Sequence, residues 1–234
     1  MSTAYYETGG LRFWNQIEIA HRNYAAEQLL NVIQKSLTDI NRGWIFHQWD
    51  APILTNMERL SGEYTGDEVF ILQAQLADKP IALRPETTPS SYEVVRQLMH
   101  QGKPPICVWQ AGKSFRRERM DGASPSKLRF NEFYQCEFQC VYSVGSKADY
   151  KAHVLQDLLR IVPILVGGAE VRVVDSDRLP NYSKHTVDIE AMFNGGWKEV
   201  ASISTRTDFS DTEEVLEIAF GLDRLVEIAF SNRA

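Results

Sequence analysis

The chain has 234 residues, 44% of them hydrophobic and 24% charged, which excludes extended disorder and suits a single domain over residues 1–234. Its formal net charge of −6 argues against a broad nucleic-acid surface, so we expect no DNA partner and only a local contact with any RNA. No apolar run approaches the roughly 20 residues of a membrane helix and no signal peptide is evident, so we expect a cytoplasmic protein with no membrane partner.

Residues 13–40 predict an amphipathic helix, because apolar side chains recur at threes and fours along them. Gly43 ends the helix, and the apolar run Trp44–Leu54 predicts a strand whose Pro52 suits an edge or an interface. An apolar run of this kind needs a partner surface, so we expect a homodimer through it. Helix, glycine, strand and proline occur together in many folds, and the pattern alone is not specific.

The strand at 81–83 leads into a turn made rigid by proline, which places Arg84, Glu86 and Thr87 at its mouth, where side chains can converge on a ligand. The structural alternative is an ordinary strand-to-helix connection, with Thr87 or Thr88 near the helix cap. The other elements expected nearby are a strand at 68–72, a helix at 91–100 and a buried strand at 106–110.

A hairpin is predicted from Lys113–Arg119 and Phe130–Tyr142, joined by a polar turn at 120–127. A period of two divides the second strand into one face with Phe130, Glu132, Tyr134, Cys136 and Phe138 and another with Asn131, Phe133, Gln135, Glu137 and Gln139. The second face, with Arg116 and Glu118 of the first strand, offers a cation for phosphate, acceptors for amines and a ring for a base. A solvated hairpin with cross-strand ion pairs is the alternative, but it does not explain Phe133 or Glu137.

Three cysteines, Cys107, Cys136 and Cys140, cannot all form disulfides with one another. The spacing of the last two has no second pair that would complete a zinc site. We therefore expect reduced thiols in the core.

The region at about 146–180 predicts a small insert with little chemistry, whose helix at 146–162 is ended by Pro163 and the glycine pair at 167–168. Strands are expected at 171–174 and 186–192, followed by a strand-like segment at 195–209 that on its own resembles a surface hairpin with a Gly-Gly turn.

The last run, 214–230, predicts a strand that passes through Gly221 into a helix. Such a junction lets a ligand approach the backbone closely and places Arg224 in the first helical turn, where it suits a terminal phosphate. An ordinary strand–helix unit with Arg224 solvated is the alternative.

Several of these segments resemble the sequence motifs of class II aminoacyl-tRNA synthetases. Phe115–Glu118 followed by Asn131–Glu137 is similar to motif 2, and the glycyl branch, in the group of the histidyl and threonyl enzymes, is closest. The other matches are motif 1 at about 14–54, the Arg-Pro-Glu-Thr signature at 84–87, the Gly-Trp-x-Glu strand at 196–199 and motif 3 at about 214–230 with Gly-Leu-Asp-Arg at 221–224, while motif 2 as a whole spans about 113–142. The matches occur in the family's order.

The resemblance implies an α+β fold, with an antiparallel sheet of six or seven strands flanked by helices, and the use of ATP and Mg²⁺. It also implies nucleotide roles for six residues. These are Arg116 on the α-phosphate, Arg224 on the γ-phosphate, Phe133 stacked on adenine, Glu118 accepting from the adenine amino group, Arg206 on the nucleotide and Glu217 on magnesium, with Arg116, Arg224 and Glu217 as the catalytic residues.

For the amino acid, the resemblance implies that Glu86, Glu137 and Glu199 surround one ammonium group. Three carboxylates in a closed site repel one another unless a cation binds, so we expect the site to recognise the substrate mainly by its ammonium group. Thr87 lies beside them, and Ser202 and Ala219 form the wall that faces the substrate side chain.

Three positions depart from the glycyl pattern. Ala219 stands where the family has a serine, Ser202 where it has a glycine, and Asn131 where it has an arginine. The space of one missing methylene discriminates between substrates by only about 1–3 kcal/mol. Strong selection for one amino acid therefore needs a protein side chain that occupies this space. Ser202 fills the wall if its side chain points inward, so we expect glycine first and alanine or serine as the alternative.

The function expected from the resemblance is activation of a small amino acid to an aminoacyl-adenylate and its transfer, most readily to the acceptor end of tRNA. A carrier protein or a small molecule is an equally open acceptor. The chain ends ten residues after Arg224, so we expect no anticodon-binding domain. The alternative is a catalytically silent paralogue that serves as a binding or regulatory subunit, but such a protein has no reason to retain Arg116, Glu118, Glu217 and Arg224 together.

Overall fold

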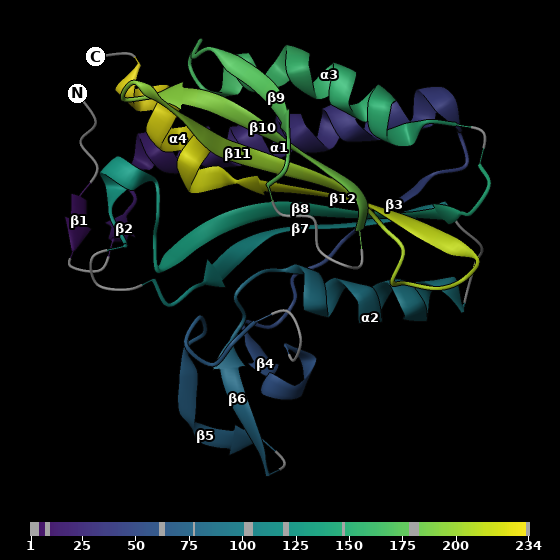
Figure 1. The fold of residues 1–234 in the computed structure, drawn as a ribbon, viewed down its shortest axis with the longest axis horizontal. Helices are drawn as coiled ribbons and strands as arrows, with labels where there is room; N and C mark the ends of the chain where they lie inside the picture. The colour runs from purple at the N-terminus through teal and green to yellow at the C-terminus, as the bar shows by residue number, and fades with distance from the viewer. Residues whose placement is uncertain are drawn as a thin grey trace.

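The fold is organised by one large sheet with helices on both faces (Figure 1). The computed structural model describes residues 5–7, 10–60, 64–76, 78–100, 105–118, 122–146, 148–177 and 183–232. The large sheet contains, in spatial order, β3 (Ile45–Gln48), β7 (Ile106–Phe115), β8 (Glu132–Ser143), β12 (Glu213–Gly221), β11 (Gly196–Arg206), β10 (Ser183–Phe193) and β9 (Val171–Asp175). All neighbours pair antiparallel except β3 and β7, which are parallel. The prediction of a six- or seven-stranded sheet flanked by helices is confirmed. The sheet differs from the expected antiparallel one only at its edge, where β3, one of the seven strands, pairs parallel to β7.

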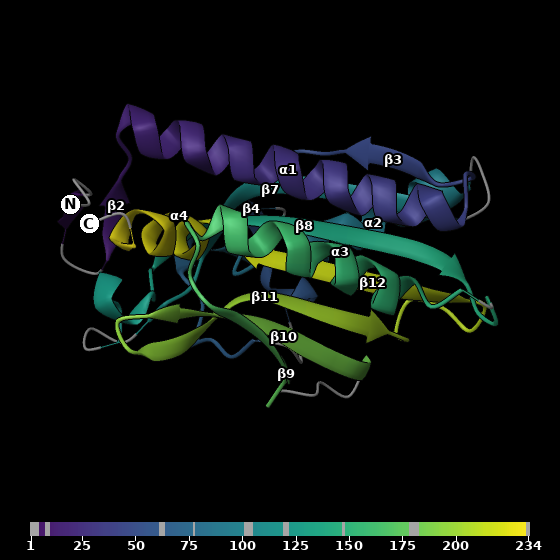
Figure 2. The same cartoon turned by 90° about the horizontal axis from the view of Figure 1, so that it is seen from above.

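Among the described residues, three helices cover one face of this sheet and a fourth lies on the other (Figures 1 and 2). The three are α1 (Gln16–Ile40), α3 (Tyr150–Leu165) and α4 (Leu222–Ser231), and the fourth is α2 (Thr88–Met99). A smaller sheet of β4 (Leu54–Asn56), β6 (Lys79–Leu83) and β5 (Ile71–Leu76), with the short helix η1 (Met57–Arg59), projects below α2 in Figure 1. The N-terminal strands β1 (Tyr5–Glu7) and β2 (Leu11–Phe13) form a separate hairpin.

The long helix α1 begins later than its hydrophobic pattern indicates. Asn15 caps it, because its side-chain oxygen accepts from the backbone N–H of Glu18 at 3.0 Å while the Glu18 carboxylate accepts from the Asn15 N–H at 3.2 Å. Phe13 therefore lies in β2, outside the helix. Helix α1 then packs its apolar stripe against the sheet through Leu29 and Ile33, which are fully buried.

The two faces of the sheet follow the predicted period of two. On β8, Cys136 and Phe138 face the helix-covered core and are fully buried. Glu137 and Gln139 alternate with them and form hydrogen bonds on the opposite face. The three cysteines are free and buried, as expected, and the Sγ atoms of Cys107 and Cys140 lie 3.2 Å apart across β7 and β8.

Several predicted boundaries are wrong. The single strand expected over Trp44–Leu54 is divided between β3 and β4, which belong to different sheets, with Pro52 in the connection. Helix α3 continues past Pro163, because a proline in the last turn removes only one helical hydrogen bond, and it ends where Gly167 and Gly168 adopt positive φ angles of 68° and 85°.

The hairpin strand expected over Lys113–Arg119 ends at Phe115, so Arg116 and Glu118 lie in the loop that follows β7. The predicted turn at 120–127 includes the short helix η2 (Pro125–Lys127), and residues 119–121 and 178–182 lie outside the described residues. Strand β5 starts at Ile71, three residues after the predicted start at Glu68. No described helix has the length and the apolar character that crossing a bilayer requires.

Candidate active site

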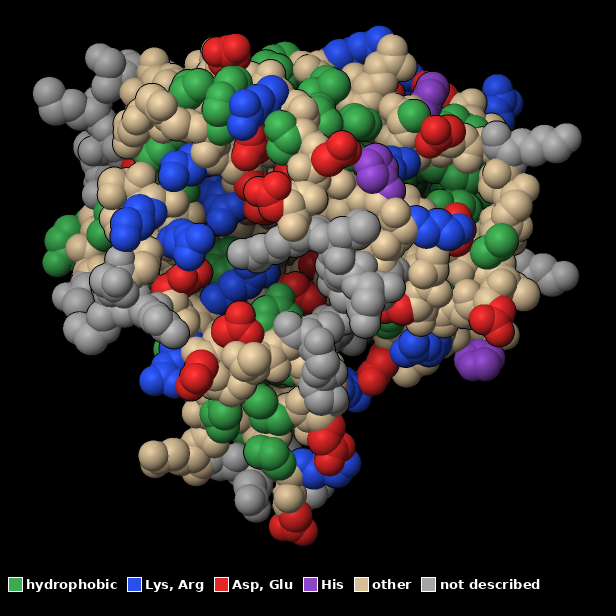
Figure 3. Space-filling model, in the orientation of Figure 1, with side chains coloured by type: hydrophobic (Ala, Val, Ile, Leu, Met, Phe, Trp, Pro, Cys, Tyr) green, Lys and Arg blue, Asp and Glu red, His purple; other side chains and the backbone are tan. Residues whose placement is uncertain are grey.

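The sheet face opposite α1, α3 and α4 carries polar side chains in rows across the strands. Residues directly opposite each other on antiparallel strands share a face, so the register identifies each row. One row is Gln110, Glu137, Ala219, Ser202 and Asp188, and the next is Val108, Gln139, Glu217, Ser204 and Thr186. Figure 3 shows a hollow on this side of the molecule, with acidic side chains deep inside it and basic side chains gathered beside it.

Glu137 lies at the centre of this face and is 2% exposed. Its carboxylate accepts hydrogen bonds from the hydroxyls of Thr87 and Thr88 and from the Gln139 amide at 2.5 Å. Thr87 is the N-cap residue of α2 but makes no side-chain capping bond there. The expected position of Thr87 near the helix cap is confirmed, but its hydroxyl joins the start of α2 to the carboxylate on β8.

Two further carboxylates are close to Glu137. Glu217 accepts from Gln139 at 3.0 Å, and Glu86 accepts from the hydroxyl of Tyr64. Burial raises the pKa of Glu86 to about 7, and the charges of Glu137 and Glu217 add to this effect. Burial and Glu217 likewise raise the pKa of Glu137. The cluster resists full ionisation, so a bound cation would be stabilised there.

Arg206 neutralises one end of the carboxylate cluster. Its guanidinium donates to Glu217 at 2.8 Å and to Asp208 at 2.7 Å, and it lies 5.0 Å from the ring of Tyr92. Burial alone would lower the pKa of Arg206, but Glu217 and Asp208 outweigh it and raise that pKa. Arg206, for which a nucleotide contact was expected, is held by these two carboxylates.

Two predicted phosphate-binding arginines lie at the other end of the face. Arg116 donates to the carbonyl of Pro85 at 3.1 Å, lies 5.4 Å from the ring of Phe133 and approaches Glu86 to 3.7 Å. Arg224 donates to the carbonyl of Leu128 at 3.2 Å. Arg116 thus stands between the carboxylate cluster and the aromatic ring expected to stack on adenine.

The arginines of this end lie close enough to affect one another. Burial lowers the pKa of Arg224, the Glu199 carboxylate opposes this, and Arg116 and Arg129 lower the pKa further by charge repulsion. A polyphosphate would relieve that repulsion, because its oxygens pair with several guanidinium groups at once.

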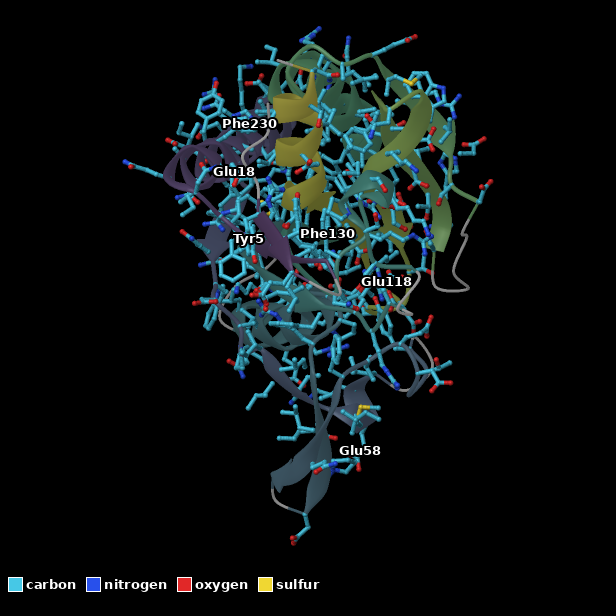
Figure 4. The ribbon with its side chains drawn as sticks, turned by 90° about the vertical axis from the view of Figure 1, so that its left-hand side faces the viewer. Tyr5, Glu18, Glu58, Glu118, Phe130 and Phe230 are labelled. Carbon is cyan, nitrogen blue, oxygen red and sulfur yellow. The ribbon has the colours of Figure 1, made fainter. Side chains whose placement is uncertain are left out.

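Glu118 lies in the loop at this end, between the large sheet and the small one in Figure 4, where Glu58 marks the short helix η1 that accompanies the small sheet. Its backbone N–H donates to the side chain of Asn131 at 2.8 Å, and its carboxylate is 3.5 Å from Arg129. The backbone N–H of Arg116 donates to the Asn131 carbonyl at 3.0 Å. Asn131, which departs from the family's arginine, therefore fixes the loop that carries Arg116 and Glu118.

Glu199 does not join Glu86 and Glu137 as expected. Its carboxylate is 3.4 Å from Arg224, and its carbonyl accepts from the same guanidinium at 2.7 Å. A bulge in β11, where Glu190 pairs with Glu199 directly after Ile189 pairs with Ala201, turns Val200 into the core and leaves Glu199 on the polar face opposite Glu190. The third carboxylate of the cluster is Glu217.

Ser202 and Ala219 lie opposite each other on β11 and β12, on the face that carries Glu137 and Glu217. The hydroxyl of Ser202 hydrogen-bonds to the carboxyl of Asp188 on the next strand. The side chain of Ser202 is therefore on the side of the proposed pocket but is directed toward β10.

Sequence reasoning missed several residues that hold the site together. Thr88 was considered only as a cap, and Gln139 was placed on the correct face without a role. Arg84, expected at the mouth of the turn, is 1% exposed and donates to the carbonyls of Lys113 at 2.8 Å and Ala51 at 2.6 Å. Gly112 makes room for it, since a Cβ there would lie 2.4 Å from an Arg84 nitrogen. Only the turn's Arg-Pro-Glu-Thr motif signals Arg84, because its partners come from distant segments.

No protein-family model matches this chain. Over 135 residues it is 34% identical to the glycine–tRNA ligase of Macrococcus caseolyticus, covering 55% of this chain and 29% of that protein. The glycine–tRNA ligase of Staphylococcus aureus strain JH9 is also 34% identical over 135 residues, with 28% of that protein covered. The chain thus spans less than a third of the length of these relatives.

Among solved structures, prolyl-tRNA synthetase from Cryptosporidium parvum, complexed with halofuginone and AMPPNP, is similar to this chain with a TM-score of 0.75 at 17% sequence identity. The match covers 96% of this chain and 48% of the prolyl-tRNA synthetase chain. The chain has the class II aminoacyl-tRNA synthetase fold, and its sequence resembles glycyl-tRNA synthetase. Pyrrolysyl-tRNA synthetase from Desulfitobacterium hafniense agrees, with a TM-score of 0.61 at 23% identity over 88% of this chain and 70% of that one. In this class II core, the polar face of the sheet is the candidate active site.

Proposed function

We propose that this chain joins the carboxylate of a small amino acid, with glycine favoured, to the α-phosphate of ATP and passes the aminoacyl group to an acceptor, tRNA in the first instance. The observation that carries the proposal is the separation of charge along one sheet face. Arg116, Arg129 and Arg224 lie at one end, and Glu86, Glu137 and Glu217 lie next to it. An amino acid and ATP match this arrangement, since one brings an ammonium group and the other a polyphosphate.

The position of Arg116 suits the reaction. Its guanidinium is 3.7 Å from Glu86 and 5.4 Å from the ring of Phe133, so a group bound beside it lies between an amine site and a base site. When the substrate carboxylate attacks the α-phosphorus and the bond to pyrophosphate breaks, negative charge builds on the phosphoryl oxygens. A guanidinium already fixed by the Pro85 carbonyl stabilises that charge without reorganising.

The carboxylate cluster would orient the amine. The ammonium group of the substrate replaces the proton that burial favours on Glu86, so binding fixes the amine and releases a proton. Thr87 and Thr88 hold the Glu137 carboxylate in place by hydrogen bonds. No protein nucleophile is needed, because the substrate carboxylate attacks directly.

Magnesium fits this site as a companion of ATP, not as a resident metal. Within the described residues no three metal-ligating side chains form a group. Mg²⁺ in nucleotide sites commonly takes one or two carboxylates together with phosphate oxygens and waters. Glu217 offers Oε1, since its contacts to Arg206 and Gln139 are made through Oε2. The ion would neutralise phosphate charge there.

We also propose that the chain forms a homodimer through β3 and the segment after it. Strand β3 is an edge of the large sheet, and four apolar side chains in this region are 40–51% exposed. These are Ile45, Trp49, Ile53 and Leu54. Light scattering at micromolar concentration should give the mass of a dimer, and a monomeric mass would contradict this part of the proposal.

Exchange of labelled pyrophosphate into ATP, screened with all twenty amino acids, tests the proposed reaction. Glycine, or alanine or serine in its place, should support exchange. Exchange with none of the twenty would refute activation and leave a binding or regulatory subunit as the better account. A preference for leucine or histidine would refute the small pocket. If exchange occurs but tRNA is not charged, the acceptor is another molecule, such as a carrier protein.

A further inference from the structure

Asp188 lies on the proposed active-site face but has no part in the chemistry described so far. It stands on β10 opposite Ser202, which stands opposite Ala219 on β12. Neighbouring strands are about 4.8 Å apart, so the Asp188 backbone lies about 10 Å from that of Ala219. This distance places the carboxyl at the edge of the wall where a substrate side chain would lie.

The carboxyl of Asp188 has an unmet hydrogen-bonding capacity. Ser202 and Ser176 hydrogen-bond to it. Its Oδ1 atom is nevertheless buried and has no hydrogen-bond partner among the residues that the structure describes. Buried polar atoms in folded proteins nearly always have partners, and a missing donor carries a cost in stability. A bound molecule that supplies a donor would remove that cost.

The neighbouring groups do not supply the donor. Thr186 and Ser204, in the adjacent row, are bonded to each other at 2.9 Å. Glu199 and Glu190 add negative charge near Asp188, and Glu190 is itself paired with Arg172 at 2.6 Å. The surroundings are therefore rich in acceptors and favour a donor from the ligand.

The size of the pocket limits what that donor can be. Ala219 is smaller than the serine of the glycyl pattern, and the Ser202 hydroxyl is directed toward β10 by its bond to Asp188. A smaller side chain at position 219 leaves more room for a small group on the substrate, and Ser202 and then Asp188 follow along the same row of the sheet.

We propose that Asp188 and Ser202 form the part of the amino-acid pocket that binds a hydroxyl group of the substrate, and that the chain accepts serine in preference to alanine. The inference rests on the proposed function, since it names a substrate of the same site. In this arrangement the serine hydroxyl donates to Asp188 Oδ1, while its ammonium group occupies the carboxylate cluster. Alanine has the same backbone and one methyl group but leaves Oδ1 without a donor.

Exchange kinetics with serine, alanine and glycine test the inference. In the unaltered protein, kcat/KM for serine should exceed that for alanine by about tenfold or more, as expected for a hydrogen bond to a charged group. Asp188→Ala should bring the serine-to-alanine ratio close to one. Asp188→Asn, which preserves the shape, should lower the ratio by a smaller factor. Asp175→Asn removes an exposed carboxylate on the neighbouring strand β9 and should leave the ratio unchanged.

A binding measurement separates this inference from the proposed function. Free serine should protect the protein against thermal unfolding more than free alanine does, and Asp188→Ala should abolish the difference. If no amino acid supports exchange but serine protects against thermal unfolding more than alanine does, the hydroxyl-binding pocket is supported and the proposed reaction is refuted. If glycine supports exchange but serine is no better than alanine, the inference is overturned while the proposed reaction stands. An unchanged ratio in folded Asp188→Ala also overturns it.

Discussion

The two faces of the large sheet are built from the same strands but carry different properties. On the helix-covered face, Phe138, Ile218 and Phe220 are fully buried in the main core. On the other face, Glu137 and Glu217 crowd like charges together. One face provides stability, and the other holds charges that a ligand would satisfy. Substitutions one residue apart on one strand should therefore have opposite consequences.

The largest effect expected is on the helix-covered face. Phe138→Ala should lower the free energy of unfolding by about 3–5 kcal/mol, because it removes a buried ring and leaves a cavity. Urea denaturation measures this change. The adjacent substitution Glu137→Gln is the matched comparison and should cost no stability. A loss below about 1 kcal/mol in Phe138→Ala would show that this face can collapse around the gap.

On the polar face, activity should fall while stability is kept. Arg116→Ala and Arg224→Ala should each reduce pyrophosphate exchange by about 10²–10³-fold, the effect usual for removing a fixed group that stabilises developing negative charge. The midpoint of thermal unfolding should change little. Arg160→Ala, on the exposed side of α3, is the control and should leave exchange intact. Wild-type exchange rates in both active-site variants would refute the assignment.

The pH dependence of stability should identify the charge on the polar face. Glu86 has a folded pKa of about 7 against 4.5 for the ordinary group, so the folded state binds more protons between these values. The stabilisation that protonated Glu86 adds to the free energy of unfolding is complete below about pH 4.5 and is lost as the pH rises through about 7.

Glu86→Gln removes this loss, and we expect it to be more stable than the unaltered protein at pH 8 by on the order of 1–3 kcal/mol, with reduced exchange. Denaturation at a series of pH values measures the difference. Part of the slope should remain in the variant, since burial also raises the pKa of Asp223 to about 7. Glu58→Gln in the short helix η1 is the control, because its side chain is 63% exposed, and it should change stability far less than Glu86→Gln. Parallel curves for Glu86→Gln and the unaltered protein would contradict the assigned charge.

The smallest effect expected concerns the helix layer. Asn15→Ala removes the cap of α1 and should cost about 1 kcal/mol without changing exchange. Asn31→Ala, at an exposed position in the same helix, is the matched control and should be neutral or slightly stabilising. Equal stability of the two variants would mean that the capping box contributes nothing measurable.

The sequence predicted those features that depend on local pattern. The alternation along β8 and the strand-to-helix junction at Gly221 were both correct, because each is determined by neighbouring residues. The failures involve packing between distant segments. The division of 44–54 between two sheets depends on which strands pair, and the role of Thr87 depends on where α2 crosses β8. The pairing of Glu199 with Arg224 joins β11 to the start of α4, and no local pattern indicated it.

A crystal structure of the protein with a sulfamoyl analogue of glycyl-adenylate would test the central claim most directly. The ammonium group should lie within hydrogen-bond distance of Glu137 and Glu86, and the sulfamoyl group should contact Arg116, with the adenine against Phe133. A bound analogue with its adenine in the carboxylate cluster, or one that avoids this face altogether, would contradict the account.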